Sequence, residues 1–177
     1  MITSKKQLKE YIEADYNVNK FSRISRYTNS RCQFFRILRK LEFLINTNSS
    51  KLLIFYYRCR LSSLSEKLGI TIWPNCSGKG LYIPHYGSIV VNENAKFGEN
   101  CIIQNGVNVS DGVVWGKGIY LGAGAKLLTG VRLADNTIVG ANAVVTKIFE
   151  EENIVIAGIP VKKYLIREEI LVEQKYN

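Results

Sequence analysis

An apolar side chain recurs at every sixth position from residue 91 to residue 145, without a break. A helix repeats its apolar face about every 3.6 residues and a strand at every second residue, so neither pattern explains this period. A six-residue period is typical of a parallel β-helix built from hexapeptide repeats. The ten positions are Val91, Phe97, Ile103, Val109, Trp115, Leu121, Leu127, Leu133, Val139 and Val145.

A second regularity follows the first at a fixed distance. Three hexapeptides form one triangular coil, so residues 18 apart are expected to stack. Gly98, Gly116, Gly122 and Gly140 directly follow periodic residues, and we expect unusual backbone angles there. The position four after each periodic residue is small or β-branched, which suits a tight corner inside a narrow prism: Ala95, Cys101, Val107, Val113, Ile119, Ala125, Val131, Thr137 and Ala143.

The chain of 177 residues is predicted to hold three parts. Residues 1–69 form a basic α-helical N-terminal region, residues 70–160 form the β-helix domain, and residues 161–177 form a short C-terminal cap helix. A solenoid needs covered ends, so the two helical parts are expected to cap it.

Helix signals divide the N-terminal region. A short helix is expected over residues 4–14 with Ser4 as its N-cap, and residues 15–30 are polar and partly irregular. An apolar stripe predicts a helix over residues 31–46. A second helix follows over residues 51–68 and closes at Gly69, so the two predict an antiparallel helical hairpin.

The charge of the chain is uneven. Residues 1–70 carry 14 Lys and Arg against 5 Asp and Glu, whereas residues 71–177 carry 10 of each. The formal net charge of +9 therefore lies in the N-terminal part. Such a segment binds a membrane surface, an acidic polymer or nucleic acid, or is a set of solvated helix faces. A binding surface and a set of solvated helix faces both stay open as interpretations. No nucleic-acid motif accompanies the basic region.

Targeting and metal signals are weak. The longest apolar run, residues 52–57, is far too short for a bilayer span, and the N-terminus has no apolar core of signal-peptide type. We expect a cytoplasmic protein, with peripheral contact to the inner membrane face as an open alternative. The cysteines form no CxxC pair and predict reduced thiols and no zinc site: Cys32, Cys59, Cys76 and Cys101.

Four segments together carry a family resemblance: GKGLYIPHYGSIVV, IYLGAGAKLLTGV, IVGANAVVTK and IAGIPVKKY. With the repeat, they resemble the serine acetyltransferase branch of hexapeptide-repeat acyltransferases, closest in character to O-acetyltransferases of capsule and exopolysaccharide clusters. The resemblance covers roughly residues 50–165. It implies a mainly β fold, a left-handed parallel β-helix, with acetyl-CoA as donor, a hydroxyl acceptor and no metal. It also implies a homotrimer, and leaves open whether the helices pair two trimers.

His85 is the only histidine of the chain. Its segment, YIPHYGSIVV, resembles the family's catalytic-histidine strand, although an isolated histidine is more often structural. O-acetylation needs a base that takes the hydroxyl proton while the oxygen attacks the thioester carbon. Imidazole suits this because its ordinary pKa, about 6.5, lies near working pH. We therefore predict that His85 is the general base.

The predicted donor side rests on residues 18 apart. Ala123 and Gly124 should stack on Ala141 and Asn142, and side chains this small leave backbone groups accessible to a pantetheine arm. In the resembled family the positions of Ala123 and Ala141 contact CoA through the main chain. Plain corner chemistry is the alternative explanation. Basic residues after the GIP turn are predicted near the CoA phosphates, with a third as a weaker candidate: Lys162, Lys163 and Lys147.

The predicted acceptor side follows from the same spacing. Gln104 and Asn105 come 18 residues or so after Tyr86 and should stack near His85, where they orient substrate or form a ladder along the solenoid. Tyr82 and Tyr86 are candidate sugar-stacking surfaces. Trp115 sits at a periodic position, so core packing is the better interpretation for it.

Three departures from serine acetyltransferases affect the acceptor. That family has an Asp directly before the catalytic His, where this chain has Pro84, and another Asp at a position near Ile70. It also has an Arg-His-Pro loop, where this chain has only residues 111–113, Asp-Gly-Val. These groups recognise the amino-acid carboxylate or support the base, so a sugar hydroxyl is the favoured acceptor. Serine O-acetylation is the first alternative, and a non-catalytic β-helix that binds a membrane surface or anionic polymer is the second.

Overall fold

Short strands from successive coils stack into three sheets, which form the three sides of a prism and confirm the predicted β-helix. The structure is a computed structural model and describes residues 1–166. The first sheet stacks β1 (Ile70–Thr71), β2 (Ile89–Val91), β5 (Asn108–Val109), β8 (Lys126–Leu127) and β11 (Val144–Val145). The second stacks β4 (Ile102–Ile103), β7 (Tyr120–Leu121), β10 (Ile138–Val139), β12 (Ile154–Ala157) and β13 (Lys162–Ile166). The third stacks β3 (Lys96–Phe97), β6 (Val114–Trp115) and β9 (Arg132–Leu133).

The strand register confirms the predicted stacking distance in the regular coils. Val90 pairs with Asn108, and Asn108 pairs with Lys126, so each partner lies 18 residues further along the chain. The first coil is longer, because Ile70 pairs with Ile89 and Tyr82 bridges to Ile102. The strict repeat therefore begins only after the segment that carries His85.

The periodic residues fill the inside of the prism. All ten are buried, with at most 6% of any side chain exposed, and the second series from Ala95 to Ala143 is buried as well. Phe97 and Trp115 stack with ring centroids 4.4 Å apart. The expectation that Trp115 is a core residue is confirmed.

Glycine is required directly after the periodic residues for a different reason than predicted. At Gly122, an added Cβ would lie 2.6 Å from the backbone nitrogen of Ala141, so close approach of two coils excludes a side chain there. The left-handed backbone lies two residues later, at the third position after each periodic residue. That position is always Gly or Asn between residues 100 and 142: Asn100, Gly106, Gly112, Gly118, Gly124, Gly130, Asn136 and Asn142.

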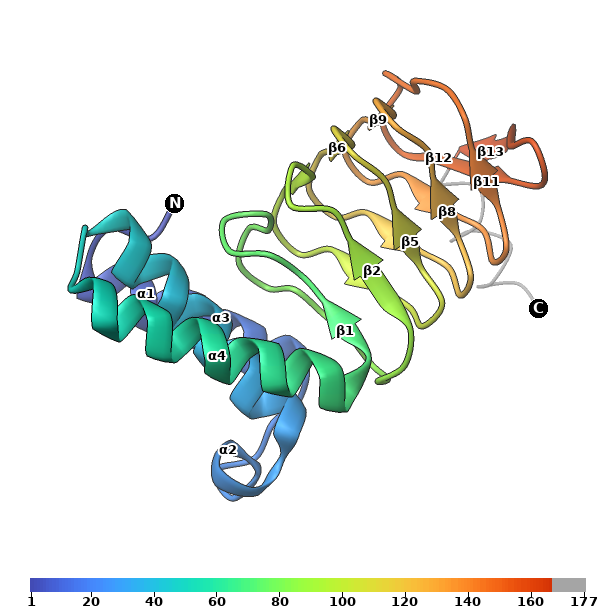
Figure 1. Ribbon diagram of the computed structural model, residues 1–177. Coiled ribbons are helices and arrows are strands. Elements are labelled where there is room, and N and C mark those ends of the chain that lie inside the picture. The colour runs from blue at the N-terminus through green and yellow to red at the C-terminus, as the bar shows by residue number, and fades with distance from the viewer. Residues whose placement is uncertain (167–177) are drawn as a thin grey trace.

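Four helices precede the solenoid and cover one end of it (Figure 1). They are α1 (Lys5–Val18), α2 (Ser25–Thr28), α3 (Ser30–Asn46) and α4 (Lys51–Leu68). Ser4 caps α1 in a capping box with Gln7, and Gly69 ends α4 in the left-handed conformation, both as predicted. The helix α1 is longer than predicted, and the short α2 lies inside the segment expected to be irregular.

A buried ionic cluster joins these helices to the first coil. The Arg39 side chain on α3 is fully buried and donates to both carboxylate oxygens of Asp15 on α1, at 2.8 and 3.3 Å. It also donates to Glu42, at 3.1 and 3.2 Å. Burial alone would lower the pKa of Arg39, but the carboxylates of Glu42 and Asp15 outweigh it and raise that pKa above its ordinary value. The guanidinium therefore stays charged inside the protein.

The cluster satisfies backbone groups at the open edge of the first coil. Arg39 donates to the carbonyl oxygens of Ser77, at 3.0 Å, and Gly78, at 2.6 Å. The carboxylate of Asp15 accepts from the backbone N–H of Leu81 at 2.9 Å, and Glu42 accepts from that of Asn75 at 2.9 Å. Unpaired edge groups would otherwise be buried without partners. The N-terminal helices thus act as the cap that a solenoid requires.

The other end of the solenoid is closed by a strand where a helix was predicted. The chain reverses after β12, and β13 pairs antiparallel with it, so that Lys162 lies opposite Ala157. The backbone edge of β12 offers unpaired hydrogen-bonding groups, and this pairing satisfies them better than a helix laid across the end. The rest of the predicted cap helix, residues 167–177, lies outside the described residues.

Replacing Arg39 by Met is expected to destabilise the protein by about 3–5 kcal/mol, because Asp15 and Glu42 would remain buried without their cation. Denaturant unfolding measures the loss. Lys40→Met is the matched control, since Lys40 is exposed on the same helix. A loss no larger than that of the control would contradict the role given to the cluster.

Candidate active site at one corner of the solenoid

One corner of the prism gathers most of the predicted site residues. The chain passes there from the sheet of β4 to the sheet of β5, once in every coil. Residues 84–88, 104–107, 122–125 and 140–143 form this corner in successive coils, and residues 158–161 follow at its end. The residues brought together are His85, Tyr86, Gln104, Asn105, Ala123, Gly124, Ala141 and Asn142.

Contacts between neighbouring coils confirm that this corner is continuous. The backbone N–H of Gly124 donates to the carbonyl of Asn105 at 2.9 Å, and that of Asn142 donates to the carbonyl of Ala123 at 2.8 Å. An added Cβ at Gly87 would lie 3.8 Å from the Cβ of Asn105, so the His85 loop stacks on the same column. With about 4.8 Å per strand spacing, four coil steps from His85 to the last turn span roughly 19 Å. The corner can therefore accommodate an extended ligand.

The loop that carries His85 is held from the helical side. Arg31, near the start of α3, donates to the carbonyl of Ile83 at 3.0 Å and also to that of Pro84. The side chain of Asn19 accepts from the backbone N–H of Ile83 at 3.2 Å. On the other side, the N–H of Gly87 donates to the carbonyl of Leu68 at the end of α4, at 2.9 Å.

The imidazole itself points to solvent. His85 is exposed, and within residues 1–166 its ring makes no hydrogen bond. Pro84, directly before it, brings no carboxylate to orient the ring. An exposed imidazole can take a proton from an incoming hydroxyl group without displacing a protein partner.

Small residues in the later coils leave the corner open. Ala123 and Gly124 are partly exposed, and Ala141 and Asn142 are exposed. Their side chains project little, so a ligand that lies along the corner can approach the backbone closely. The predicted CoA-binding positions are thus accessible to solvent, and the same small residues also form the turns themselves.

The predicted phosphate-binding lysines separate in the structure. Lys162 and Lys163 leave the last turn of the same corner on β13, whereas Lys147 lies at the next corner, after β11. Lys163 pairs with Glu151, at 2.5 Å. Among the described residues, Lys162 has no acidic partner and is exposed. Lys162 is therefore the better placed of the three for an anionic group at this corner.

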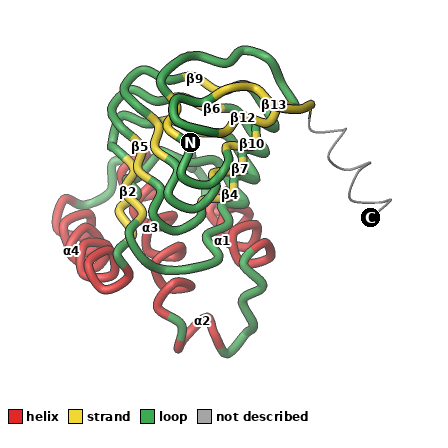
Figure 2. Tube along the Cα trace, turned by 90° about the vertical axis from the view of Figure 1, so that its right-hand side faces the viewer, coloured by secondary structure: helices red, strands yellow, loops and turns green. Residues whose placement is uncertain are grey.

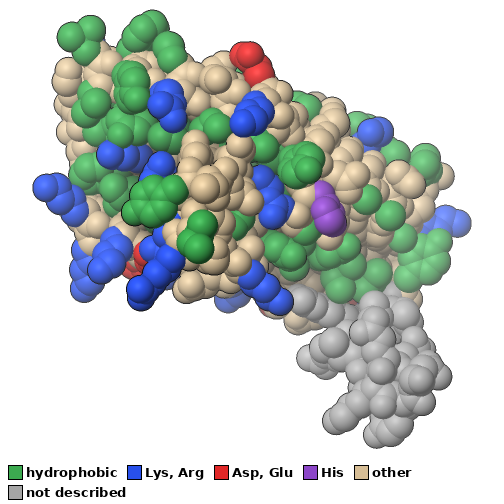
Figure 3. All heavy atoms as spheres, turned by 90° about the horizontal axis from the view of Figure 1, so that it is seen from below, with side chains coloured by type: hydrophobic (Ala, Val, Ile, Leu, Met, Phe, Trp, Pro, Cys, Tyr) green, Lys and Arg blue, Asp and Glu red, His purple; other side chains and the backbone are tan. Residues whose placement is uncertain are grey.

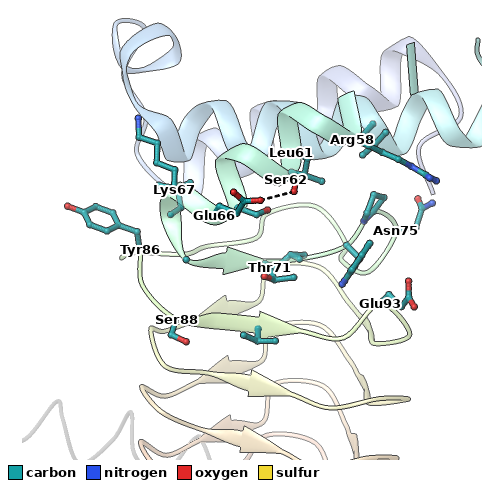
Figure 4. Close-up of a pocket in the computed structure, with 18 of the residues that line it drawn as sticks. Arg58, Leu61, Ser62, Glu66, Lys67, Thr71, Asn75, Tyr86, Ser88 and Glu93 are labelled. Atoms are coloured by element: carbon teal, nitrogen blue, oxygen red, sulfur yellow. Dashed lines mark hydrogen bonds between the residues drawn. The ribbon is translucent and has the colours of Figure 1, made fainter. Parts of the chain in front are cut away.

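A groove of about 1130 Å³ borders the site on the side of α4 (Figure 4). It runs between α4 and the first two strands of the first sheet, and Tyr86 stands at its edge beside the His85 loop. Trp73 lines it with 46% of its side chain exposed. Hydroxyl and charged groups near Tyr86 contribute to the lining: Ser62, Ser65, Glu66, Lys67, Thr71 and Ser88. Tyr82 lies just before the corner, partly buried.

Sequence reasoning missed the residues that hold the His85 loop. Arg31 and Asn19 lie more than fifty residues before the loop, and nothing in their local sequence separates them from other polar helix residues. Trp73 was also missed, although its place in the irregular first coil indicated an exposed aromatic side chain. Among the described residues, no group of three His, Cys, Asp or Glu side chains could hold a metal ion. No helix described here is long and apolar enough to cross a bilayer.

Comparison with known proteins gives a fold but no family assignment from sequence. No family model matches the chain, and no curated protein matches it. Among solved structures, serine acetyltransferase of Neisseria gonorrhoeae superposes with a TM-score of 0.74 at 24% identity, covering 93% of this chain and 69% of that one. Soybean serine acetyltransferase complexed with serine has a TM-score of 0.74 at 21% identity, covering 90% of this chain and 70% of that one.

A third similar structure contains coenzyme A. Serine acetyltransferase of Brucella abortus strain S19 in complex with coenzyme A has a TM-score of 0.71 at 24% identity, covering 90% of this chain and 68% of that one. These likenesses establish that the chain has the left-handed β-helix fold seen in these structures, with helices before the solenoid. They do not support the narrower resemblance to capsule and exopolysaccharide enzymes.

Replacing Arg31 by Gln is expected to loosen the His85 loop, because two carbonyl groups lose their charged donor. The amide of Gly87 should then exchange its hydrogen about tenfold faster or more, while the amide of Tyr120 in β7 keeps its protection. Hydrogen exchange of the folded protein measures both. Arg36→Gln, on the same helix, is the control and should change neither; equal rates at Gly87 in the two variants would refute the tether.

Proposed function

We propose that this protein transfers an acetyl group from acetyl-CoA to a hydroxyl group, with His85 as general base. The observation that carries this proposal is the corner column, in which the only histidine of the chain stands at one end of a line of small, accessible residues. The similar structures support acetyl transfer, because one was solved with coenzyme A and another with serine. They favour L-serine over a sugar as the acceptor.

The proposed reaction needs one base and one set of hydrogen-bond donors. His85 takes the proton from the acceptor hydroxyl as its oxygen attacks the thioester carbonyl carbon. The tetrahedral intermediate carries its negative charge on the former carbonyl oxygen, where backbone N–H groups of the corner stabilise it. Its collapse breaks the carbon–sulfur bond and expels the CoA thiolate, which receives the proton from His85. The products are the acetyl ester and free CoA.

The donor is proposed to lie along the corner. Ala123, Gly124, Ala141 and Asn142 contact the pantetheine arm through their backbones, and Lys162 meets a phosphate near the last turn. Gln104 and Asn105, in the coil between His85 and these residues, orient the acceptor or the thioester oxygen. The family resemblance implies a homotrimer, in which a CoA on the exposed corner would lie at a boundary between two copies.

A sugar hydroxyl is the second candidate acceptor, and the groove beside α4 favours it. Its volume of about 1130 Å³ is far more than L-serine needs, and its lining includes Tyr86, the residue next to His85. Exposed aromatic rings such as Trp73 and Tyr86 give a sugar ring an apolar face to stack on, and the hydroxyl-bearing lining offers hydrogen-bond partners. Pro84 in place of the aspartate of serine acetyltransferases points the same way.

Replacing His85 by Ala is expected to lower the rate of acetyl transfer by about 10²–10⁴-fold, the usual contribution of a general base. Release of free thiol from acetyl-CoA measures the rate with L-serine and with a panel of sugars. Calorimetric CoA affinity should stay within about twofold of wild type, because the backbone contacts remain. Unchanged turnover of the His85→Ala variant would exclude His85 as the base. If the wild type itself binds no CoA, a non-catalytic β-helix would be favoured.

Replacing Trp73 by Ala separates the two acceptors. If a sugar occupies the groove, its KM should rise about three- to tenfold, the value of one lost aromatic contact. Because Thr71 pairs with Val90, Trp73 lies several residues along the sheet from the corner of His85, so L-serine bound at His85 does not contact it and its KM should not change. Because Trp73 is exposed, its replacement should disturb the fold little. The CoA affinity of the variant serves as the control. An equal rise for both acceptors would point to a distorted first coil.

A further inference from the structure

The α2 segment projects from the body of the molecule, away from the stack of coils (Figures 1 and 2). It presents two large apolar side chains to solvent, because Ile24 and Tyr27 are each 76% exposed. Lys20 and Arg23 stand next to them and are exposed as well. These four residues are called the α2 tip below.

The two cations of the α2 tip form no ion pair with acidic residues in the described part of the chain. Arg26, in the same segment, pairs with Glu13 at 3.1 Å and lies over the ring of Tyr16. By contrast, neither Lys20 nor Arg23 meets an acidic partner within residues 1–166. Both cations therefore stand beside two exposed apolar groups without an ion pair to the described residues.

The first half of α4 repeats this composition. Leu52 is 82% exposed and Phe55 is 66% exposed, with Lys51 and Arg60 exposed on the same helix. The side to which α2 projects shows many Lys and Arg side chains over the helical half, with hydrophobic groups among them and few acids (Figure 3). The only histidine lies on this same side (Figure 3).

We propose that the helical region binds the surface of an anionic lipid bilayer, with the α2 tip as its main contact. Aliphatic and aromatic side chains flanked by Lys and Arg suit the boundary between headgroups and acyl chains. Each cation near an anionic leaflet adds to the attraction, and residues 1–70 carry the entire net charge of +9. Docked in this way, the protein turns the side that carries His85 toward the bilayer.

Two other occupants fit the observations less well. A second copy of the chain, joined about a twofold axis, would bring one +9 region against another and repel it. A soluble anionic polymer would use Lys20 and Arg23 but would leave Ile24 and Tyr27 in water. A bilayer accounts for both kinds of side chain at once.

Flotation of the full-length protein with lipid vesicles, without acetyl-CoA, tests the proposal independently of acetyl transfer. Vesicles of phosphatidylcholine alone are compared with vesicles containing about one third phosphatidylglycerol. Wild type should float with the anionic vesicles only, and less so at high salt. The pairs Ile24→Ser with Tyr27→Ser, and Lys20→Gln with Arg23→Gln, should each lower the partition coefficient about tenfold or more. All four side chains are exposed, so circular dichroism should show an intact fold.

The control changes an apolar and a basic residue on the solenoid, Leu128→Ser with Lys126→Gln, and should keep binding within twofold of wild type. Three results would overturn the proposal. The first is that wild type fails to bind anionic vesicles. The second is that the variant with Ile24→Ser and Tyr27→Ser binds these vesicles and soluble polyglutamate as well as wild type does, which indicates a polymer site. The third is that this variant loses a concentration-dependent dimer in ultracentrifugation while its vesicle binding stays unchanged.

Discussion

A single buried guanidinium lies at the junction of the two halves of this protein. Arg39 lies between Asp15 and Glu42, and these three side chains reach four backbone positions of the first coil. One cation between two buried anions would be an expensive arrangement by itself. The backbone N–H groups of Leu81 and Asn75 donate further charge-assisted hydrogen bonds to carboxylate oxygens that Arg39 also contacts, and these bonds offset much of that cost.

The position of the candidate base depends on this junction. Every later coil rests on the one before it through strand pairing at a constant register, but the first coil has no coil before it. The helices take that place, and the segment from Asn75 to Gly87 follows their side chains instead of the 18-residue repeat. His85 therefore stands at the point where the regular column ends, with its ring exposed, and Arg31 and Asn19 hold the backbone on either side of Ile83.

The solenoid was predictable because its geometry imposes a period on the sequence. An interior position recurs every six residues, so the periodic series from Val91 to Val145 identified the core, and the spacing of 18 brought Ala123 and Ala141 to one corner. The Gly or Asn at the third position after each periodic residue is also visible in the sequence, whereas the unusual backbone angles were predicted at Gly98 and its equivalents. Those glycines are required by close packing of coils and not by their backbone angles.

Contacts between distant segments could not be predicted in this way. Asp15 and Arg39 lie on different helices, 24 residues apart, and Arg31 lies 52 residues before Ile83, so no local pattern relates them. The strand β13 was mistaken for the start of a helix because its apolar and basic residues fit either structure, and only the open edge of β12 decides between them. The groove on which the proposed sugar acceptor rests exists only once α4 lies against the first coil.

The central claim is that His85 and the small residues of the corner form one site. A crystal structure of the protein with coenzyme A tests it most directly. The account predicts the pantetheine arm along the corner, against Ala123 and Ala141, with its sulfur at the imidazole of His85. Coenzyme A bound on another face of the solenoid, or along this corner with its sulfur at the end away from His85, would contradict it.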